Sequence, residues 1–370
     1  MRAITYAIAL CAGCSFTEPQ SAIDAPRGPI DTPLFDAPPI DVIKAPCEGT
    51  IVGTGFQICV LAQPTVMLMV PNGTIQTDSS SQCAPASAYT SSPDVCLLLG
   101  TAVNIPMNLT ATGQRPLAVV ATDGGVMIGG AGKIDVSSHD DALGAGTQLT
   151  CGGGTPADSG GGTSGGGFAG SYGGVGGNGG RGSSGGNGGI AAAPGGFTTL
   201  AGGCPGGAGA GMGAGAGGAG GSAVWIIATT KIQIYGSIDA SGGAGGGSTM
   251  GDNAGGGGAG AGGLIGLDAP QLMGNGNIFA NGGGGGEGCG SVTDGNPGGV
   301  SAGPAMPAPG GTGGGNGGDG GTGSFGAVLF GVNGIDGGSG DGGGGGGGGA
   351  GVVWIRSGVL SPVNVAPPAS

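Results

Sequence analysis

The chain has 370 residues, 104 of them glycine, and a net charge of −13 from 8 basic and 21 acidic side chains. The basic residues are scattered along the whole length. This excludes a nucleic-acid-binding patch, which needs clustered Lys and Arg to neutralise phosphates. No apolar run approaches the ~18 residues of a membrane-spanning helix. Glycine at this level is typical of disorder, but the 38% apolar residues lie in short β-prone runs, which favours a folded chain with glycine-rich loops.

The first residues read as an export signal. Met1–Arg2 is a short positive segment, Ala3–Leu10 is apolar, and small residues precede a cysteine in Cys11–Cys14. This end of the segment resembles a bacterial lipobox, in which the cysteine after the cleavage site carries the lipid. We therefore expect residues 1–13 to be a signal peptide and Cys14 to be the lipidated residue. An ordinary cleaved signal is the alternative.

Residues 14–46 are expected to be a lipid-anchored linker. They repeat a Pro/Asp-rich unit, as in Ile23–Pro26, Ile30–Pro33 and Phe35–Pro38. Proline at this density blocks helix and favours extended polyproline II. Such a tether would hold the folded part clear of the membrane at ~3.1 Å per residue.

The seven cysteines after Cys14 are disulfide candidates, since the chain is expected to be exported. Local proximity pairs Cys47 with Cys59 and Cys83 with Cys96, and Cys151 with Cys204 would close one glycine-rich loop. Cys289 is left over, so either one pairing is wrong or one thiol is free. Residues 47–114, which hold the first two pairs and several strand-like runs, are expected to form a β cap.

Residues 115–358 contain an internal repeat of about forty residues. The segment 232–242 aligns with 272–282, an earlier copy lies at 132–138, and a degraded copy lies at 334–338. An apolar strand precedes each copy, at 117–121, 224–228, 264–267 and 327–330, and Val352–Ile355 matches 224–226. Two short strands cannot bury their own apolar face but can do so when stacked. We therefore expect an all-β fold, a short parallel β-solenoid of about four coils, followed by a tail at 359–370. A β-sandwich with glycine-rich loops is the alternative.

The long glycine-rich segments keep a period of three, as in residues 173–190 and 314–322. A three-residue period fits polyproline II geometry, and strands of glycine can approach closely enough to hydrogen-bond one another. These segments are expected to be either packed polyglycine II bundles or flexible loops.

Because the chain is so rich in glycine, its matches to catalytic and metal-binding motifs are no more than chance would give. Gly162–Gly166 and Gly182–Gly186 match G-x-S-x-G without the strand and helix that a nucleophile elbow needs. The one histidine, His139, precedes Asp140 and Asp141 and is interpreted as part of a solvated turn. The sparse acidic residues show no clustering. We expect no catalytic residue, no metal site and no cofactor.

The whole layout resembles a group of myxobacterial glycine-rich surface lipoproteins of unknown function, PE-PGRS-like by composition. The residues that carry the resemblance are Cys11–Ser15, the linker, Arg115–Thr122, Ile134–His139 and Phe279–Gly283. The resemblance implies a location at the outer membrane or cell surface and no particular activity.

The sequence therefore predicts a non-enzymatic exported lipoprotein that is a structural or adhesive scaffold of the cell envelope. Its partners would be the membrane, through the lipid, and surface glycans or matrix. The alternative is a solenoid that binds or cleaves polysaccharide. Binding would require exposed aromatic platforms, whereas Trp225 and Trp354 fall in apolar strands and are expected to pack inside.

Overall fold

The computed structural model describes residues 47–139, 142–148, 151, 153–195, 199–249, 253–290, 292–360 and 362–370. The chain divides into two units, Met1–Asp36 and Ala37–Ser370, and every described residue belongs to the second. The expected signal peptide, Cys14 and the linker lie outside the described residues. Strands and no helices make up the regular structure of the described part, which confirms the all-β prediction.

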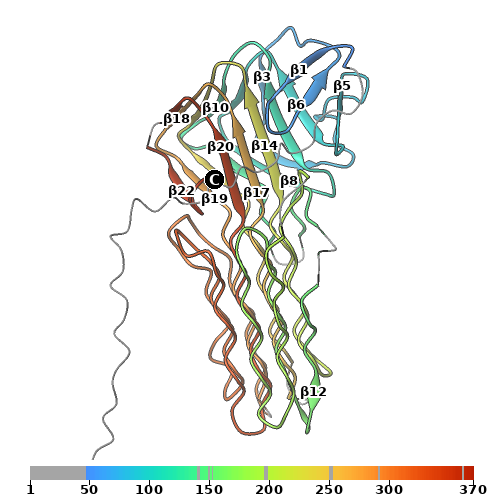
Figure 1. The fold of residues 1–370 in the computed structure, drawn as a ribbon, viewed down its shortest axis with the longest axis vertical. Coiled ribbons are helices and arrows are strands. Elements are labelled where there is room, and N and C mark those ends of the chain that lie inside the picture. Colours follow the sequence, from blue (N-terminus) through green and yellow to red (C-terminus); the bar gives the residue numbers. More distant parts are fainter. Residues whose placement is uncertain are drawn as a thin grey trace, which may run out of the picture. The chain divides into compact units, whose positions relative to one another are not determined.

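Three parallel sheets form the strand-rich part of this unit (Figure 1). Sheet 1 contains β6 (Cys96–Gly100), β9 (Leu117–Ala121), β14 (Ala223–Ala228), β17 (Leu264–Asp268) and β20 (Val352–Arg356). Sheet 2 contains β3 (Leu68–Met69), β7 (Val103–Ile105), β10 (Val126–Ile128), β15 (Lys231–Ile234), β18 (Gln271–Gly274) and β21 (Val359–Leu360). Sheet 3 contains β4 (Gly73–Gln76), β8 (Asn108–Thr112), β11 (Lys133–Asp135), β16 (Ser237–Asp239), β19 (Asn277–Phe279) and β22 (Asn364–Ala366).

The chain visits the three sheets in rotation, and each strand pairs in parallel with the corresponding strand of the previous round. The register pairs residues that the sequence alignment superposes, such as Ile232 with Leu272 and Ile238 with Ile278. The period-two alternation points one set of side chains toward a shared core. In sheet 3 this buried set is the row Leu109, Ile134, Ile238 and Ile278, with Val365 packed against it.

Sheet 1 is buried on both faces, which explains its nearly continuous apolar sequence. Val224 and Ile226 of β14 join the core between the sheets, whereas Trp225 and Ile227 join a second cluster on the other face. This second cluster packs against an antiparallel sheet of β1 (Thr50–Val52), β2 (Ile58–Val60) and β5 (Tyr89–Ser91). Trp225 is fully buried as predicted, but Trp354, at the edge of sheet 1, is only partly buried.

The parallel sheets extend beyond the residues expected to form them. Strands β3, β4 and β6 to β8, within the expected cap at 47–114, pair into the three sheets, and β21 and β22 lie in the expected tail. The copy expected at residues 334–338 is not a strand: this stretch belongs to a glycine-rich segment. The sheets instead continue with β20, β21 and β22 after that segment ends.

The three predicted disulfides are confirmed. Cys47–Cys59, Cys83–Cys96 and Cys151–Cys204 are bonded, with Cα atoms 5.7, 5.0 and 5.6 Å apart. Among the described cysteines, Cys289 is the free thiol. It is buried within a glycine-rich segment, where its Sγ accepts a hydrogen bond from the backbone of Ala254 at 3.1 Å.

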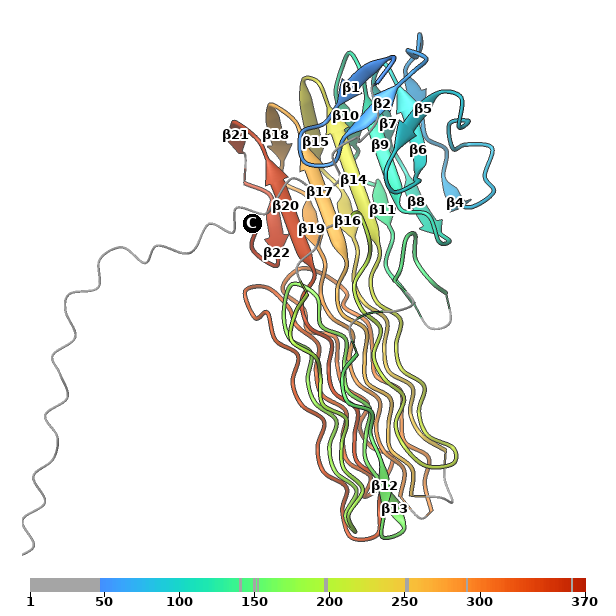
Figure 2. The ribbon, with the colours of Figure 1, turned by 45° about the vertical axis from the view of Figure 1, so that its right-hand side comes forward.

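Three glycine-rich segments leave sheet 3 and return to sheet 1, after β11, β16 and β19. Figures 1 and 2 show them running side by side beyond the ends of the sheets, with the short antiparallel pair β12 (Ser159–Gly160) and β13 (Thr163–Ser164) in the first. Backbone groups bond one another both between and within segments. Gly286 donates to Gly257 of the preceding segment, whereas Gly257 donates to Gly246, and Gly345 to Gly286, within one segment, each at 2.8 Å. This network satisfies backbone groups that would otherwise be buried without partners.

Candidate functional site: a charged cluster at the end of sheet 3

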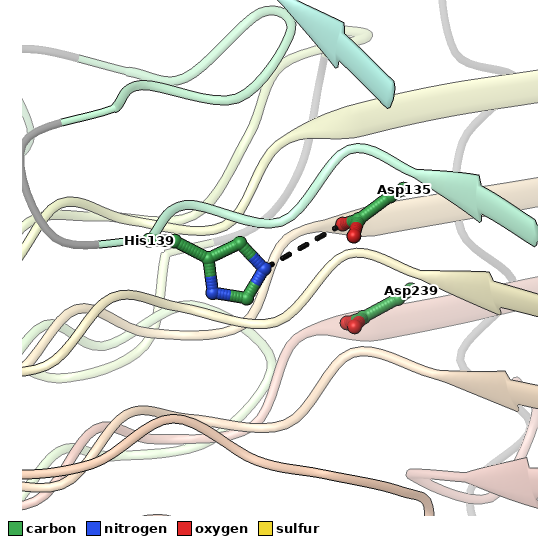
Figure 3. Close-up of side chains that lie close together, drawn as sticks. All are labelled: Asp135, His139 and Asp239. Carbon is green, nitrogen blue, oxygen red and sulfur yellow. Dashed lines mark ion pairs between the residues drawn. The ribbon is translucent and has the colours of Figure 1, made fainter. Parts of the chain in front are cut away.

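The largest group of interacting charged side chains in the described part of the chain lies where sheet 3 meets the glycine-rich segments. Asp135 and Asp239 are the last residues of β11 and β16, and they are paired neighbours in the register. Strand alternation sends Ile134 and Ile238 into the core, so that Lys133 and Asp135 share the other face of β11. Figure 3 shows the two carboxylates beside each other, with the His139 ring turned toward Asp135.

Lys133 bridges the two strands. Its Nζ lies 2.7 Å from Oδ2 of Asp135 and 3.0 Å from Oδ2 of Asp239. The Asp239 side chain is 2% exposed, that of Asp135 15% and that of Lys133 29%. A carboxylate as buried as that of Asp239 is costly unless it is paired. The ammonium therefore supplies the charge that allows the aspartate to be buried.

His139, on the solvent side, and the buried Ser137 complete the cluster. His139 Nε2 lies 3.8 Å from Oδ1 of Asp135, and the Ser137 hydroxyl is hydrogen-bonded to both of these side chains. The His139 side chain is 40% exposed. It is thus the member of the cluster most accessible from outside.

The same turn follows each aspartate. The Ser137 N–H donates to Oδ1 of Asp135 at 3.2 Å, and the Ser241 N–H donates to Oδ1 of Asp239 at 3.0 Å. An aspartate that caps the backbone two residues later is a common way of starting a turn. The Asp-x-Ser sequence of both copies therefore ends the strand and directs the chain into its glycine-rich segment.

The environment separates the pKa values of the two aspartates. For Asp135, burial acts to raise the pKa, but hydrogen bonds from His139, Lys133 and Ser137 and the Lys133 charge together lower it. For Asp239, burial raises the pKa, Lys133 opposes this, and the Asp135 charge adds to it. Asp135 is therefore the firmly ionised member of the pair.

The pKa values of the two bases of the cluster are both raised. Burial acts to lower the pKa of Lys133, but the charge of Asp239 and the contacts with Asp135 outweigh it, so that this pKa is raised. The pKa of His139 is raised, mainly by its hydrogen bond with Asp135. The carboxylates therefore favour the protonated forms of both bases.

Asp135, His139 and Asp239 offer three metal-ligand atoms that all lie within 4.8 Å of one another. The Lys133 ammonium, however, contacts both carboxylates, so the chain already supplies a cation at this position. General acid catalysis by Asp239 would require access to a substrate, which its burial denies. The geometry fits an electrostatic link between consecutive strands better than it fits a metal site or a catalytic pair.

The expectation that the acidic residues do not cluster was wrong. His139 is half-buried and bonded to Asp135 and Ser137, whereas Asp140 and Asp141 lie outside the described residues. A signal for the cluster was present in the sequence: superposing the copies at 132–138 and 232–242 aligns Asp135 with Asp239. Neighbouring copies in a stacked fold place aligned residues next to each other.

Comparisons with protein-family models, with curated proteins and with solved structures found no match. The likeness to myxobacterial surface lipoproteins therefore remains an expectation from the sequence. Within the described residues, no helix has the length and apolar character needed to cross a bilayer.

Proposed function

We propose that this chain is a non-enzymatic structural or adhesive scaffold of the cell envelope, exported and anchored by a lipid on Cys14. Its folded part would be a short β-solenoid whose long insertions pack together as a polyglycine II bundle. The solenoid interpretation is supported by the rotation of the chain among three parallel sheets. The β-sandwich alternative would instead need facing antiparallel sheets.

The observation that carries the proposal is the spacing of hydrogen bonds between glycine-rich segments. Bonds from the segment after β16 to the segment after β19 recur at every third residue, with a constant offset. These bonds are Gly242 to Asn281 at 2.9 Å, Gly245 to Gly284 at 2.9 Å and Ser248 to Glu287 at 3.2 Å. Three residues per turn is the period of a polyproline II helix, whose backbone groups point outward to partners.

A second set has the same period in the antiparallel sense. Within the segment after β16, Gly257 donates to Gly246, Gly260 to Gly243 and Gly263 to Ala240, at 2.8 to 2.9 Å. A Cβ at Gly257 would overlap the carbonyl oxygen of Ala216, and one at Gly260 would overlap that of Ala219. Close packing thus explains the glycine content. Ordered packing of this kind would make the glycine-rich part stiff, as a structural scaffold requires.

Hydrogen exchange tests the bundle. We expect the amides of Gly245, Gly257 and Gly286 to exchange far more slowly than exposed amides, because each donates to a backbone carbonyl of a neighbouring stretch of the glycine-rich segments. The measurement is exchange followed by mass spectrometry on the intact chain, with the exposed Gly153 as an internal reference. Fast exchange throughout the three glycine-rich segments would contradict the bundle and leave flexible loops as the explanation.

Lipid labelling tests the anchor. In a bacterial host that processes lipoproteins, the full chain is expected to incorporate labelled palmitate and to sediment with membranes. Cys14→Ser should abolish both, because the lipid is attached through the cysteine sulfur, whereas Cys11→Ser should leave labelling in place. Equal labelling of the wild type and Cys14→Ser would rule out an anchor at this residue.

A further inference from the structure

A cleft of about 580 Å³ lies between β1 with its following turn and the ends of the sheet 1 strands. Its size falls within the ~300–1,000 Å³ usual for sites that hold small ligands. The walls come from residues 50–54 on one side, and from residues 227–229, 268–270 and 356–358, with Thr122, on the other. None of these residues belongs to the charged cluster at the end of sheet 3.

Neighbouring strands contribute a row of side chains to this cleft. Ile227, Asp268 and Arg356 are aligned partners in β14, β17 and β20. Ile227 is buried against the antiparallel sheet of β1, β2 and β5, whereas the Arg356 side chain is 57% exposed. The row therefore begins with an aliphatic side chain, Ile227, and continues with two charged side chains, Asp268 and Arg356.

One carboxylate oxygen of Asp268 contacts Thr54, just after β1, and the other faces Arg356. Its Oδ2 accepts hydrogen bonds from the N–H and the hydroxyl of Thr54, at 2.6 and 2.7 Å. Its Oδ1 lies 3.9 Å from Nη1 of Arg356, and within the described part of the chain it accepts no hydrogen bond. The side chain is 9% exposed. A buried carboxylate is thus held in place with acceptor capacity remaining on the Arg356 side.

Trp354 adds an aromatic surface on the same face of β20, two residues before Arg356. Its ring stacks on Trp225, with centroids 4.9 Å apart and planes at 29°. The Trp225 ring lies over Gly266, the residue that pairs with both tryptophans, and a Cβ there would overlap this ring. Because β20 is the edge strand of sheet 1 and Trp354 is only partly buried, part of its indole is accessible.

We propose that this cleft, together with Trp354 on the strand that carries Arg356, binds a neutral carbohydrate. The carboxylate and the guanidinium provide adjacent acceptors and donors for vicinal hydroxyl groups, and their charges cancel. The threonine hydroxyls of the lining add further partners, and the indole offers an apolar face to the C–H side of a sugar ring. The Asp268 carboxylate would repel a phosphate, and the Arg356 guanidinium would repel an amine, so a neutral ligand fits best.

The test uses the full chain and three soluble neutral polysaccharides, dextran, laminarin and galactomannan, with alginate as an acidic comparator. Retardation in affinity electrophoresis measures binding, and the intrinsic fluorescence of the two tryptophans reports on the stacked pair. We expect at least one neutral polysaccharide to retard the protein and alter its emission. Retardation by alginate alone, or by none of the four, would overturn the proposal.

Substitutions assign the binding to the cleft. Arg356→Gln and Trp354→Ala should each weaken binding at least tenfold, whereas Trp354→Phe should retain most of it because an aromatic surface remains. Arg181→Gln, which removes a cation from a glycine-rich segment, is the matched control and should bind as the wild type does. If Arg356→Gln and Trp354→Ala bind unchanged while folded by circular dichroism, the cleft is not the site. That result would leave the scaffold proposal intact, since the bundle does not depend on the cleft.

Discussion

Gly257→Ala is expected to lower the free energy of unfolding by an amount at the upper end of the ~1–3 kcal/mol that overpacking costs, or by more. Gly257 is buried between strands of the glycine-rich segments, donating to Gly246 and accepting from Gly286. Its added methyl would overlap the carbonyl oxygen of Ala216, which is backbone and cannot turn aside. Denaturant unfolding followed by circular dichroism measures the change.

The matched control is Gly153→Ala, at an exposed glycine of the same kind of segment where an added Cβ meets nothing within 4 Å. Its backbone is not in the left-handed region, so the substitution should be neutral or should stabilise by about 0.4–1 kcal/mol through the unfolded state. If Gly257→Ala were as stable as this control, the glycine-rich segments would not be close-packed at Gly257.

The sequence predicted most where copies resemble one another. The alignment of 232–242 with 272–282 is the register of β15 and β16 against β18 and β19. The earlier copy at 132–138 likewise aligns with β16. Sequence likeness between neighbours in a stack follows from physics, because identical positions see the same core and the same adjacent strand.

The sequence failed where the sheets continue without that likeness. Strands β6 to β8 and β21 to β22 lie outside the copies found in the sequence, yet they pair in register with β9, β10, β11, β18 and β19. Conversely, Gly334–Gly338 copies the motif but lies in a glycine-rich segment. A strand joins these sheets when apolar residues alternate along it and the preceding strand offers an unpaired edge. A glycine after the strand is not required.

The charged cluster was missed for a related reason. Asp135 and Asp239 are separated by 104 positions in the sequence, and only the stacking of one copy on another brings them together. Lys133, in the first copy alone, gives the pair its cation, so inspection of either copy by itself does not reveal a cluster.

Lys133→Met is expected to lower the free energy of unfolding at neutral pH by about 3 kcal/mol, the lower end of the ~3–5 kcal/mol for removing one partner of a buried ion pair. The lower end applies because the Lys133 side chain is 29% exposed. Methionine keeps the aliphatic length but leaves Asp239 buried beside Asp135 without the ammonium. Urea unfolding measures the loss. Lys231→Met, at a lysine of β15 with no ion pair among the described residues, should change stability much less.

The stability that Lys133→Met loses relative to the wild type should become smaller as the pH falls. Burial already raises the folded-state pKa of Asp239 above its unfolded value, and loss of Lys133 removes the main influence that opposes this rise. As the pH falls through this raised pKa, the folded state takes up a proton before the unfolded state does, so stability relative to the wild type recovers. Adding Asp239→Asn should recover part of the loss already at neutral pH, since the carboxylate left without its cation is then gone. A deficit that stayed constant from neutral to acid pH would mean that the link between β11 and β16 is not electrostatic.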